Sequence, residues 1–232
     1  MTANNRLTRR AGSNDSPTPT GSEGAAPSSA KFWDKRSKHY DDAVQKHGAI
    51  YQKTIEETAS LLRKTDVVLD LGCATGEIAL DIAPHVQRVH GIDISKNMID
   101  LANKKARERQ IDNVSFCRTD AFDPRLTGQS LSAIMAFSVF HLLEDAPKTL
   151  DRLHDLLAPG GLLISETPCL AERNWVIRSL IKFAVAVGFA PMIRDFTFAD
   201  LESLVSSGHF QILESKIWDE KSRVLWILAK KV

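Results

Sequence analysis

The stretch Val67-Val-Leu-Asp-Leu-Gly-Cys-Ala-Thr-Gly76 decides the fold of this chain. Its first three residues form a short apolar run that is typical of a buried parallel strand, and Asp70 follows at the carboxyl end. Small residues then recur through the loop, before apolar residues return at helical spacing from Ile78 to Ala83. The stretch therefore predicts a strand, a glycine-rich loop and a helix, with the loop backbone close to a ligand.

The spacing of the small residues in this loop bears on which ligand it binds. A dinucleotide-binding loop needs small residues at its first, third and sixth positions. Counted from Gly72, the sixth position is Glu77, whose carboxylate would repel a pyrophosphate. The small residues stand instead at the first, third and fifth positions, which favours a ligand that is less anionic than NAD and carries an ammonium group. An NAD-binding domain stays open as a disfavoured alternative.

Two stretches carry a resemblance to a known family. Asp70-Leu-Gly-Cys-Ala-Thr-Gly76 resembles the first motif of the class I S-adenosylmethionine-dependent methyltransferases, acid-x-Gly-x-Gly-x-Gly, with Ala74 in place of the middle glycine. The run from Asp93 to Ala102 resembles their second motif, and the likeness extends from about Phe32 to the C-terminus. The domain is similar to the small-molecule enzymes of the ubiquinone and menaquinone pathways. The resemblance implies S-adenosylmethionine as the cofactor.

The expected fold is α/β, a Rossmann-like doubly wound sheet of seven strands with an antiparallel last strand. Strands are predicted to begin near residues 67, 88, 114, 131, 162, 210 and 224. Helices are predicted at about 49–63, after Ser95, after Asp145 and from Phe196 to Gly208.

The resemblance also implies which residues hold the cofactor. Asp93 would accept hydrogen bonds from both ribose hydroxyls, and Asp120 would accept one from the adenine amino group, although an Asx turn is a competing role for Asp120. The expected cofactor-binding residues are Asp70, Gly72, Cys73, Ala74, Gly76, Asp93, Ile94, Met98, Asp120, Ala121 and Phe137.

His141 is the candidate catalytic residue. It follows the fourth predicted strand, 131–137, and the loop beyond such a strand should face the methyl group. There it would take a proton from the acceptor, with a structural or cofactor-side role as the alternative. Methyl transfer from a sulfonium needs no metal and no enzyme nucleophile, and the spacing of Cys and His residues predicts no metal site. Arsenite methylation is disfavoured, because Cys73 lies in the cofactor loop and Cys117 in a predicted strand.

The ends of the methyltransferase domain are predicted from composition. Residues 1–30 are rich in Ser, Thr, Gly, Pro and Asn and are expected to be a disordered tail, which leaves 31–232 as the domain. The first helix is expected to carry Phe32, Trp33, Tyr40 and Val44 and to end near Gly48. Packing on the core would explain Trp33 and Tyr40, and the resemblance implies that both also lie over the cofactor and the substrate.

The segment at about 166–195 is unusually apolar for a connection in a fold of this kind. Three interpretations stay open: a helical lid over an apolar substrate, an oligomer surface, or a helix that lies on a membrane. The lid is favoured. Together with Trp33 and Tyr40, Trp175 and Phe183 are the candidate substrate-binding residues.

The overall charge and hydropathy limit the partners. The chain has 30 basic and 29 acidic side chains, so its charge favours no nucleic-acid partner. No apolar run approaches the roughly 20 residues that span a bilayer, and no leader precedes the domain, so a cytoplasmic protein of open oligomeric state is expected. The expected function is methyl transfer from S-adenosylmethionine to a small, apolar molecule. The alternative is a non-catalytic S-adenosylmethionine-binding or partner protein on the same fold.

Overall fold

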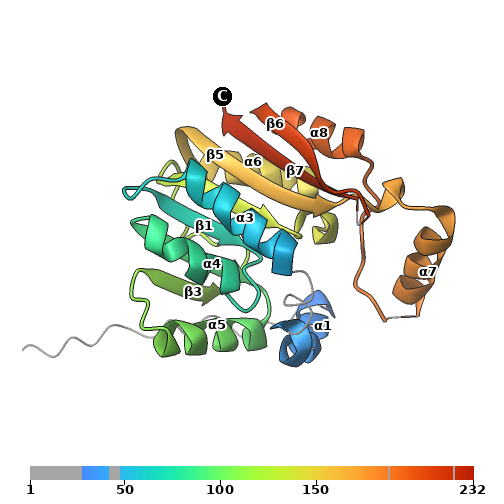
Figure 1. The fold of residues 1–232 in the computed structure, drawn as a ribbon, viewed down its shortest axis with the longest axis horizontal. Helices are drawn as coiled ribbons and strands as arrows, with labels where there is room; N and C mark the ends of the chain where they lie inside the picture. The colour runs from blue at the N-terminus through green and yellow to red at the C-terminus, as the bar shows by residue number, and fades with distance from the viewer. Residues whose placement is uncertain (1–27, 42–47, 188, 222) are drawn as a thin grey trace, which may run out of the picture.

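The computed structural model describes residues 28–41, 48–187, 189–221 and 223–232. Its centre is one sheet of seven strands in the order β3-β2-β1-β4-β5-β7-β6 (Figure 1). Strands β1 to β5 are parallel, and β7 runs antiparallel to both of its neighbours. The predicted seven-stranded sheet with its antiparallel last strand is therefore confirmed. The bounds are β1 Val67–Leu71, β2 Arg88–Asp93, β3 Val114–Arg118, β4 Leu131–Phe137, β5 Leu157–Pro168, β6 Phe210–Asp219 and β7 Val224–Lys231.

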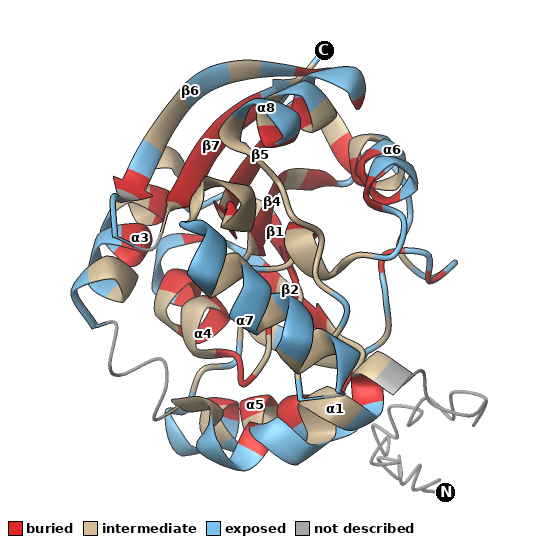
Figure 2. Ribbon diagram, turned by 90° about the vertical axis from the view of Figure 1, so that its right-hand side faces the viewer, coloured by how far each residue is buried: buried red, intermediate tan, exposed pale blue. Residues whose placement is uncertain are grey.

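Helices cover both faces of this sheet, because its central strands are apolar on both sides (Figure 2). In β1, Val68 packs with α3 and α4 on one face, whereas Leu69 packs with α6 and α8 on the other. The longer helices are α1 Ser28–Arg36, α3 Gly48–Leu61, α4 Glu77–Ile82, α5 Lys96–Glu108, α6 Ala146–Leu156, α7 Trp175–Ala186 and α8 Phe198–Ser207. Single turns of 3₁₀ helix are η1 Ser37–His39, η2 Ala83–His85, η3 Phe140–Leu142 and η4 Leu170–Glu172.

The order of the strands fixes where a ligand can bind. The chain leaves β1 toward β2 and β3 on one side, and it returns to β4 on the other side of β1. In such a sheet the connections diverge above the carboxyl ends of the two central strands and leave a crevice there. The loop after β1 and the loop after β4 border this crevice.

Side-chain caps begin three helices close to their predicted starts. The Ser95 hydroxyl accepts from the amide of Met98 at 3.2 Å, and Asp145 accepts from the amide of Lys148 at 3.0 Å. Thr197 begins α8 with a capping box. Each cap satisfies an amide that the first helical turn leaves without a partner, so the predictions at Ser95 and Asp145 are confirmed.

Some predicted boundaries differ from the structure. Helix α1 begins at Ser28 rather than Lys31, and a 3₁₀ turn interrupts the first predicted helix after Arg36. Strand β5 begins at Leu157 rather than Leu162 and passes through Pro159-Gly-Gly161, where Gly160 has a φ of +74° and the register with β4 shifts. The same strand extends to Pro168 and so includes the first residues of the predicted insertion at 166–195. Residues 1–27 of the predicted tail, and Val44, lie outside the described residues.

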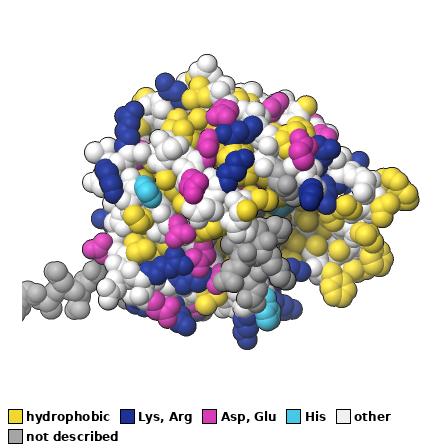
Figure 3. Space-filling view, in the orientation of Figure 1, with side chains coloured by type: hydrophobic (Ala, Val, Ile, Leu, Met, Phe, Trp, Pro, Cys, Tyr) yellow, Lys and Arg dark blue, Asp and Glu magenta, His cyan; other side chains and the backbone are white. Residues whose placement is uncertain are grey.

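Helix α7 stands apart from the sheet and the helices that cover it (Figure 1), and none of its residues is buried (Figure 2). In Figure 3 the apolar side chains at the right-hand side of the molecule lie where Figure 1 has α7. The exposed apolar residues of this region are Trp175, Val176, Leu180, Phe183, Val187, Phe189 and Met192. No helix within the described ranges combines the length and apolar character that crossing a bilayer requires.

Candidate functional site

Two adjoining cavities lie at the carboxyl ends of the parallel strands. The first, of about 370 Å³, extends toward β5 and is called the β5 cavity; the second, of about 420 Å³, extends toward β2 and is called the β2 cavity. The residues that line both are Tyr40, Gly72, Ala74, Phe137 and Ser138. The glycine-rich loop and the loop after β4 therefore form the boundary between two parts of one site.

The glycine-rich loop is held by backbone hydrogen bonds to the end of β2. The amides of Gly72 and Cys73 donate to the carbonyl of Ile92 at 2.8 and 3.0 Å. Gly72 has a φ of +69°, and a Cβ there would lie 2.9 Å from Cγ2 of Val139, so only glycine fits. Ala74 has a φ of +47°, a left-handed conformation that costs a non-glycine residue roughly 1–2 kcal/mol. The methyl group of Ala74 is thus a source of backbone strain as well as of extra bulk.

Most of the predicted cofactor residues converge on the β2 cavity. Asp93 lies at its edge, where its carboxylate accepts from the amide of Ala74 at 3.1 Å and from that of Ser95 at 2.8 Å. Asp120 also lines this cavity and accepts from the amide of Phe122 at 2.8 Å, which is the Asx turn considered as its competing role. Other predicted residues that line the cavity are Ile94, Met98, Ala121 and Trp33.

The β5 cavity contains a buried carboxylate without a partner. Asp70 lines it, and no described residue donates to its Oδ2. Burial and the negative charge of Asp93 raise the pKa of Asp70 to about 7. Burial likewise raises the pKa of the Cys73 thiol, which also lines this cavity and is therefore un-ionised near neutral pH. A cation bound in the cavity beside Asp70 would balance the charge of its ionised form.

Tyr40 lies between the two cavities. Burial and the nearby carboxylates of Asp93 and Asp70 raise its pKa to about 12, so its hydroxyl stays protonated. The ring of Trp33 meets that of Tyr40 edge-on, with 6.5 Å between the centroids. The structure therefore brings these two predicted substrate residues to the site.

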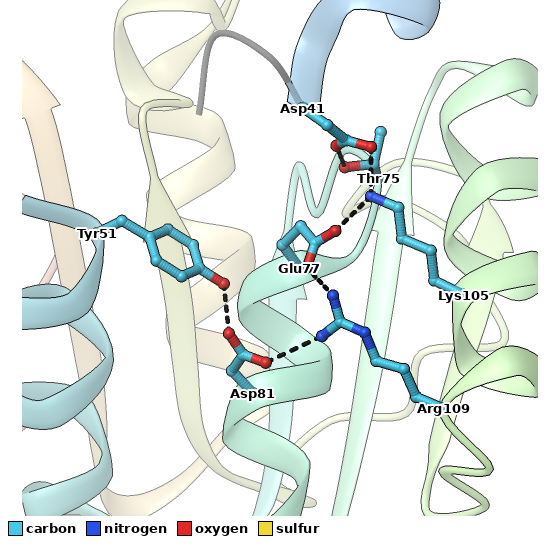
Figure 4. A network of polar contacts seen from close by, with 7 residues as sticks. All are labelled: Asp41, Tyr51, Thr75, Glu77, Asp81, Lys105 and Arg109. Atoms are coloured by element: carbon cyan, nitrogen blue, oxygen red, sulfur yellow. Dashed lines mark hydrogen bonds and ion pairs between the residues drawn. The ribbon is translucent and has the colours of Figure 1, made fainter. Parts of the chain in front are cut away.

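A network of hydrogen bonds and ion pairs joins the segment after η1 to the glycine-rich loop and to helices α4 and α5 (Figure 4). Asp41 accepts from the hydroxyl of Thr75 at 2.6 Å and pairs with Lys105 at 2.7 Å. Lys105 also pairs with Glu77 at 2.6 Å, and Arg109 pairs with the same carboxylate. Glu77 is thus neutralised by two cations, which removes most of the repulsion that the sequence suggested for a pyrophosphate.

The same network reaches α3. Arg109 pairs with Asp81 at 3.0 Å, and the hydroxyl of Tyr51 donates to that carboxylate at 2.7 Å (Figure 4). Tyr51 also lines the β5 cavity. The network therefore connects helices α3, α4 and α5 with the segment after η1, and it holds one wall of the site in place.

Several predicted residues do not line either cavity. Gly76 faces the other way, where a Cβ would lie 2.6 Å from Cζ of Phe116. Trp175 and Phe183 on α7 are 76% and 66% exposed. Their roles in binding stay predictions, and for Gly76 the geometry indicates helix-to-strand packing instead.

His141 is also absent from the lining of both cavities. It lies in η3, where its backbone carbonyl accepts from the amide of Arg194 at 2.7 Å. Its Nδ1 is buried without a partner among the described residues, and burial lowers the pKa of the imidazole to about 4. His141 is therefore neutral near pH 7 and a weak base, and its catalytic role stays a prediction that this position does not support.

The structure adds polar residues that the sequence interpretation did not assign to the site, among them Glu166 and Thr54, which line the β5 cavity. Ser138, in the loop that was expected at the mouth of the sheet, lines both cavities with a φ of +53°. The sequence does mark Glu166, because this acid follows the predicted strand 162–165, just as Asp70 and Asp93 lie at the carboxyl ends of their predicted strands. Thr54 comes from α3, far away in the sequence, and no motif marks it.

Comparison with known proteins agrees with this architecture. Residues 62–220 match a family model described as a methyltransferase domain. A crystal structure of a SAM-dependent methyltransferase from Methanosarcina mazei aligns with a TM-score of 0.62 and 21% identity, and the alignment covers 74% of this chain and 94% of that one. That likeness supports the fold.

Curated relatives match over parts of their length. The chain is 36% identical over 104 residues to aklanonic acid methyltransferase DauC of Streptomyces sp. (strain C5), which is 44% of this chain and 47% of the relative. It is 35% identical over 88 residues to the 23S rRNA (uracil(1939)-C(5))-methyltransferase RlmD of Marinomonas sp. (strain MWYL1), which is 37% of this chain and 20% of the relative. Each match spans less than half of the relative.

The family model covers the strand, the glycine-rich loop and the acid at the end of β2, together with most of the remaining sheet. The chain therefore belongs to the methyltransferase-domain family and has the fold of the class I S-adenosylmethionine-dependent methyltransferases.

Proposed function

We propose that this protein transfers the methyl group of S-adenosylmethionine to a small, largely apolar molecule. The observation that carries the proposal is the pair of joined cavities with a carboxylate for each of three hydrogen-bond-donating groups of the donor: its ammonium, its ribose hydroxyls and its adenine amino group. Asp70, whose Oδ2 has no partner among the described residues, would bind the ammonium of the methionine part, and Asp93 would bind the ribose hydroxyls. Asp120 would accept from the adenine amino group, with Phe122 beside the ring.

The chemistry that this arrangement would support is an in-line displacement. A lone pair of the acceptor attacks the methyl carbon, the bond from carbon to sulfur breaks, and its electron pair stays on sulfur to give S-adenosylhomocysteine. Where the attacking atom carries a proton, that proton passes to water or to a carboxylate in the cavity. The protein would contribute by aligning donor and acceptor and by excluding water.

The expected acceptor is a small molecule rather than RNA. DauC, by its name, methylates aklanonic acid, whereas RlmD methylates rRNA and matches this chain over only 20% of its own length. A nearly balanced charge of 30 basic and 29 acidic residues favours no polyanionic partner. The finer likeness to enzymes of the ubiquinone and menaquinone pathways belongs to this proposal, as does the alternative of a protein that binds the cofactor without transferring its methyl group.

Calorimetric titration of the full chain tests the proposal directly. S-adenosylmethionine and S-adenosylhomocysteine are expected to bind and NAD is not. Turnover of a panel of small phenols, amines and thiols then separates an enzyme from a protein that only binds the cofactor. Binding of NAD with exclusion of both sulfur nucleosides would overturn the proposal.

The raised pKa of Asp70 predicts how cofactor binding depends on pH. An ammonium pairs with the ionised carboxylate, whose fraction falls about tenfold for each pH unit below the pKa of about 7. Affinity for S-adenosylmethionine should therefore rise between pH 5.5 and 7 and then level off. Titrations across this range should lose their pH dependence in Asp70→Asn, and an equally steep dependence in that variant would contradict the assignment.

In the ligand-free protein, ionisation of Asp70 should lower the free energy of unfolding, whereas it strengthens cofactor binding. Its pKa is about 7 in the folded protein and 3.8 for an unperturbed aspartate, so between these pH values the folded state holds a proton that the unfolded state has lost. The contribution of Asp70 to the free energy of unfolding is therefore largest below pH 4 and declines as the pH rises from 4 to 7. Comparing urea unfolding of the wild type and Asp70→Asn over this range isolates that contribution.

The insertion that carries α7 is proposed to be a lid over the acceptor. Its two ends lie beside the cavities: Pro168 lines the β5 cavity, and Arg194 donates to the carbonyls of Leu143 and Glu144, which line the β2 cavity. Between these ends, Phe183 and Phe189 are 66% and 75% exposed. A movement of α7 toward the cavities would bury this apolar surface against the acceptor and exclude water.

Changing both Phe183 and Phe189 to Ser should therefore lower kcat/KM for an acceptor at least about tenfold, because full burial of one such side chain contributes roughly 1.5–3 kcal/mol. The dissociation constant of S-adenosylhomocysteine should hardly change. Leu213→Ser, at another exposed apolar residue on β6, is the matched control. If the double variant instead splits a dimer or releases the protein from lipid vesicles while turnover stays intact, the insertion is an association surface.

A further inference from the structure

The β5 cavity has an apolar wall and an acidic end. Ile50 and Phe137 form part of this wall, and Pro168 and Val224 lie near Glu166 along the sheet. Among the described residues that line the cavity, none is a lysine, an arginine or a histidine. An anionic ligand would therefore meet carboxylates without a compensating cation.

Glu166 is held in this cavity by residues far away in the sequence. The hydroxyl of Thr54 donates to its Oε2 at 2.7 Å. The indole Nε1 of Trp218, which can only donate, lies 3.0 Å from Oγ1 of Thr54. Trp218 thus occupies an acceptor site of the hydroxyl and leaves its proton for Glu166, with the Ile50 carbonyl at 3.0 Å as the competing acceptor.

The second oxygen of Glu166, Oε1, accepts no hydrogen bond from any described residue. It is also absent from the fully enclosed polar atoms without partners, so it remains accessible. Burial of the side chain raises the pKa of Glu166, whereas the Thr54 hydroxyl opposes that shift. Glu166 is therefore a carboxylate whose orientation Thr54 fixes, and its Oε1 is free to accept a hydrogen bond from a ligand.

We propose that Glu166 binds the methyl acceptor through an N–H or O–H group, so that the part of the β5 cavity beside Glu166 selects amines and alcohols as acceptors over carboxylates and phosphates. The inference rests on the proposed function, in which the ammonium of S-adenosylmethionine occupies Asp70 and leaves Glu166 for the acceptor. Thr54 is then a positioning residue, since it acts through Glu166. An amine is the preferred ligand, because its cation pairs with the carboxylate in an apolar surrounding. Where that nitrogen is the atom to be methylated, it first passes one proton to Glu166 or to water, which frees the lone pair that attacks the methyl carbon.

Three probes with the same apolar part test this selection. Phenethylamine, phenethyl alcohol and phenylacetate are titrated into the full chain loaded with S-adenosylhomocysteine. We expect affinity to decrease in that order. In Glu166→Gln, which keeps an oxygen for Thr54, the affinity for phenethylamine should fall at least about tenfold, the size expected from a hydrogen bond to a charged group. Phenylacetate should bind that variant more tightly than it binds the wild type.

Glu57→Gln is the matched control, because Glu57 lies on α3 and pairs with Lys216 outside the cavity. Thr54→Val should weaken phenethylamine binding less than Glu166→Gln does, and a larger loss would refute the positioning role. Three outcomes would overturn the inference if S-adenosylhomocysteine still binds. The wild type could bind phenethylamine and phenylacetate equally well, the ratio of these two affinities could be unchanged in Glu166→Gln, or no probe could bind. Failure of S-adenosylhomocysteine itself to bind would overturn the proposed function, and the inference with it.

Discussion

Gly76→Ala is expected to lower the free energy of unfolding by about 2–5 kcal/mol, the sum of backbone strain and overpacking. Gly76 has a φ of +78°, which alanine adopts only at a cost. A Cβ at this position would also lie 2.6 Å from Cζ of Phe116 and 2.9 Å from Cβ of Ala102. The Phe116 ring has little room to move away, because Gly91 approaches it from β2 as closely.

Urea unfolding of the two proteins measures this loss. Gly48→Ala is the control, since a Cβ at Gly48 would meet no atom within 4 Å, and its free energy of unfolding should change little. Phe116→Leu should recover part of the loss in the Gly76→Ala background although it destabilises the wild type, because the two positions are in contact. A loss below about 0.5 kcal/mol in Gly76→Ala would contradict the packing role.

The sheet could be predicted because β1, β4 and β5 contain short apolar runs, β1 and β2 each carry an acid near their carboxyl end, and a glycine-rich loop follows β1. β2 and β4 have the bounds that the sequence suggested, Arg88–Asp93 and Leu131–Phe137. Local chemistry also marked the helix starts at Ser95 and Asp145, where one side chain satisfies an amide three residues later. In all of these the determining contacts are near in sequence.

Features set by tertiary packing could not be predicted in the same way. The pairing of Glu77 with Lys105 and Arg109 joins two helices, and it weakens the inference drawn from the carboxylate alone. The contact between Thr54 and Glu166 joins residues that are 112 positions apart. Neither pairing leaves a trace in spacing or composition.

The position of His141 shows a limit of a different kind. Its strand and loop were predicted correctly, since the chain does pass from the end of β4 over the crevice and Ser138 lines both cavities. The 3₁₀ turn η3 then starts at Phe140, which is fully buried, and His141 is left out of the cavity lining. Which side chain of a tight turn faces a ligand depends on backbone angles that the sequence does not specify.

For Asp93 the sequence motif, the geometry of the site and the proposed function all agree on one role, which is to bind the ribose. Its half-buried carboxylate lines the β2 cavity, and desolvation raises its pKa although the amides of Ser95 and Ala74 oppose that shift. These two amides also fix its orientation, at 2.8 and 3.1 Å. Two ribose hydroxyls would therefore meet an acceptor that is already in position.

Asp93→Ala is accordingly expected to weaken S-adenosylmethionine binding at least about tenfold, since a hydrogen bond to a charged group contributes roughly 1.5–3 kcal/mol and two are lost. The change also leaves the amides of Ala74 and Ser95 without their acceptor, so the glycine-rich loop could shift. Asp93→Asn keeps one oxygen for these amides, and it therefore tests the loss of the ribose contact without a displaced loop.

Asp100→Ala is the control, because this exposed residue of α5 pairs only with Lys96 among the described residues. Calorimetric titration measures all three variants, with thermal unfolding as the check that each is folded. A folded Asp93→Ala protein that binds S-adenosylmethionine as tightly as the wild type would show that the ribose lies elsewhere, and the assignment of the β2 cavity to the nucleoside would fail with it.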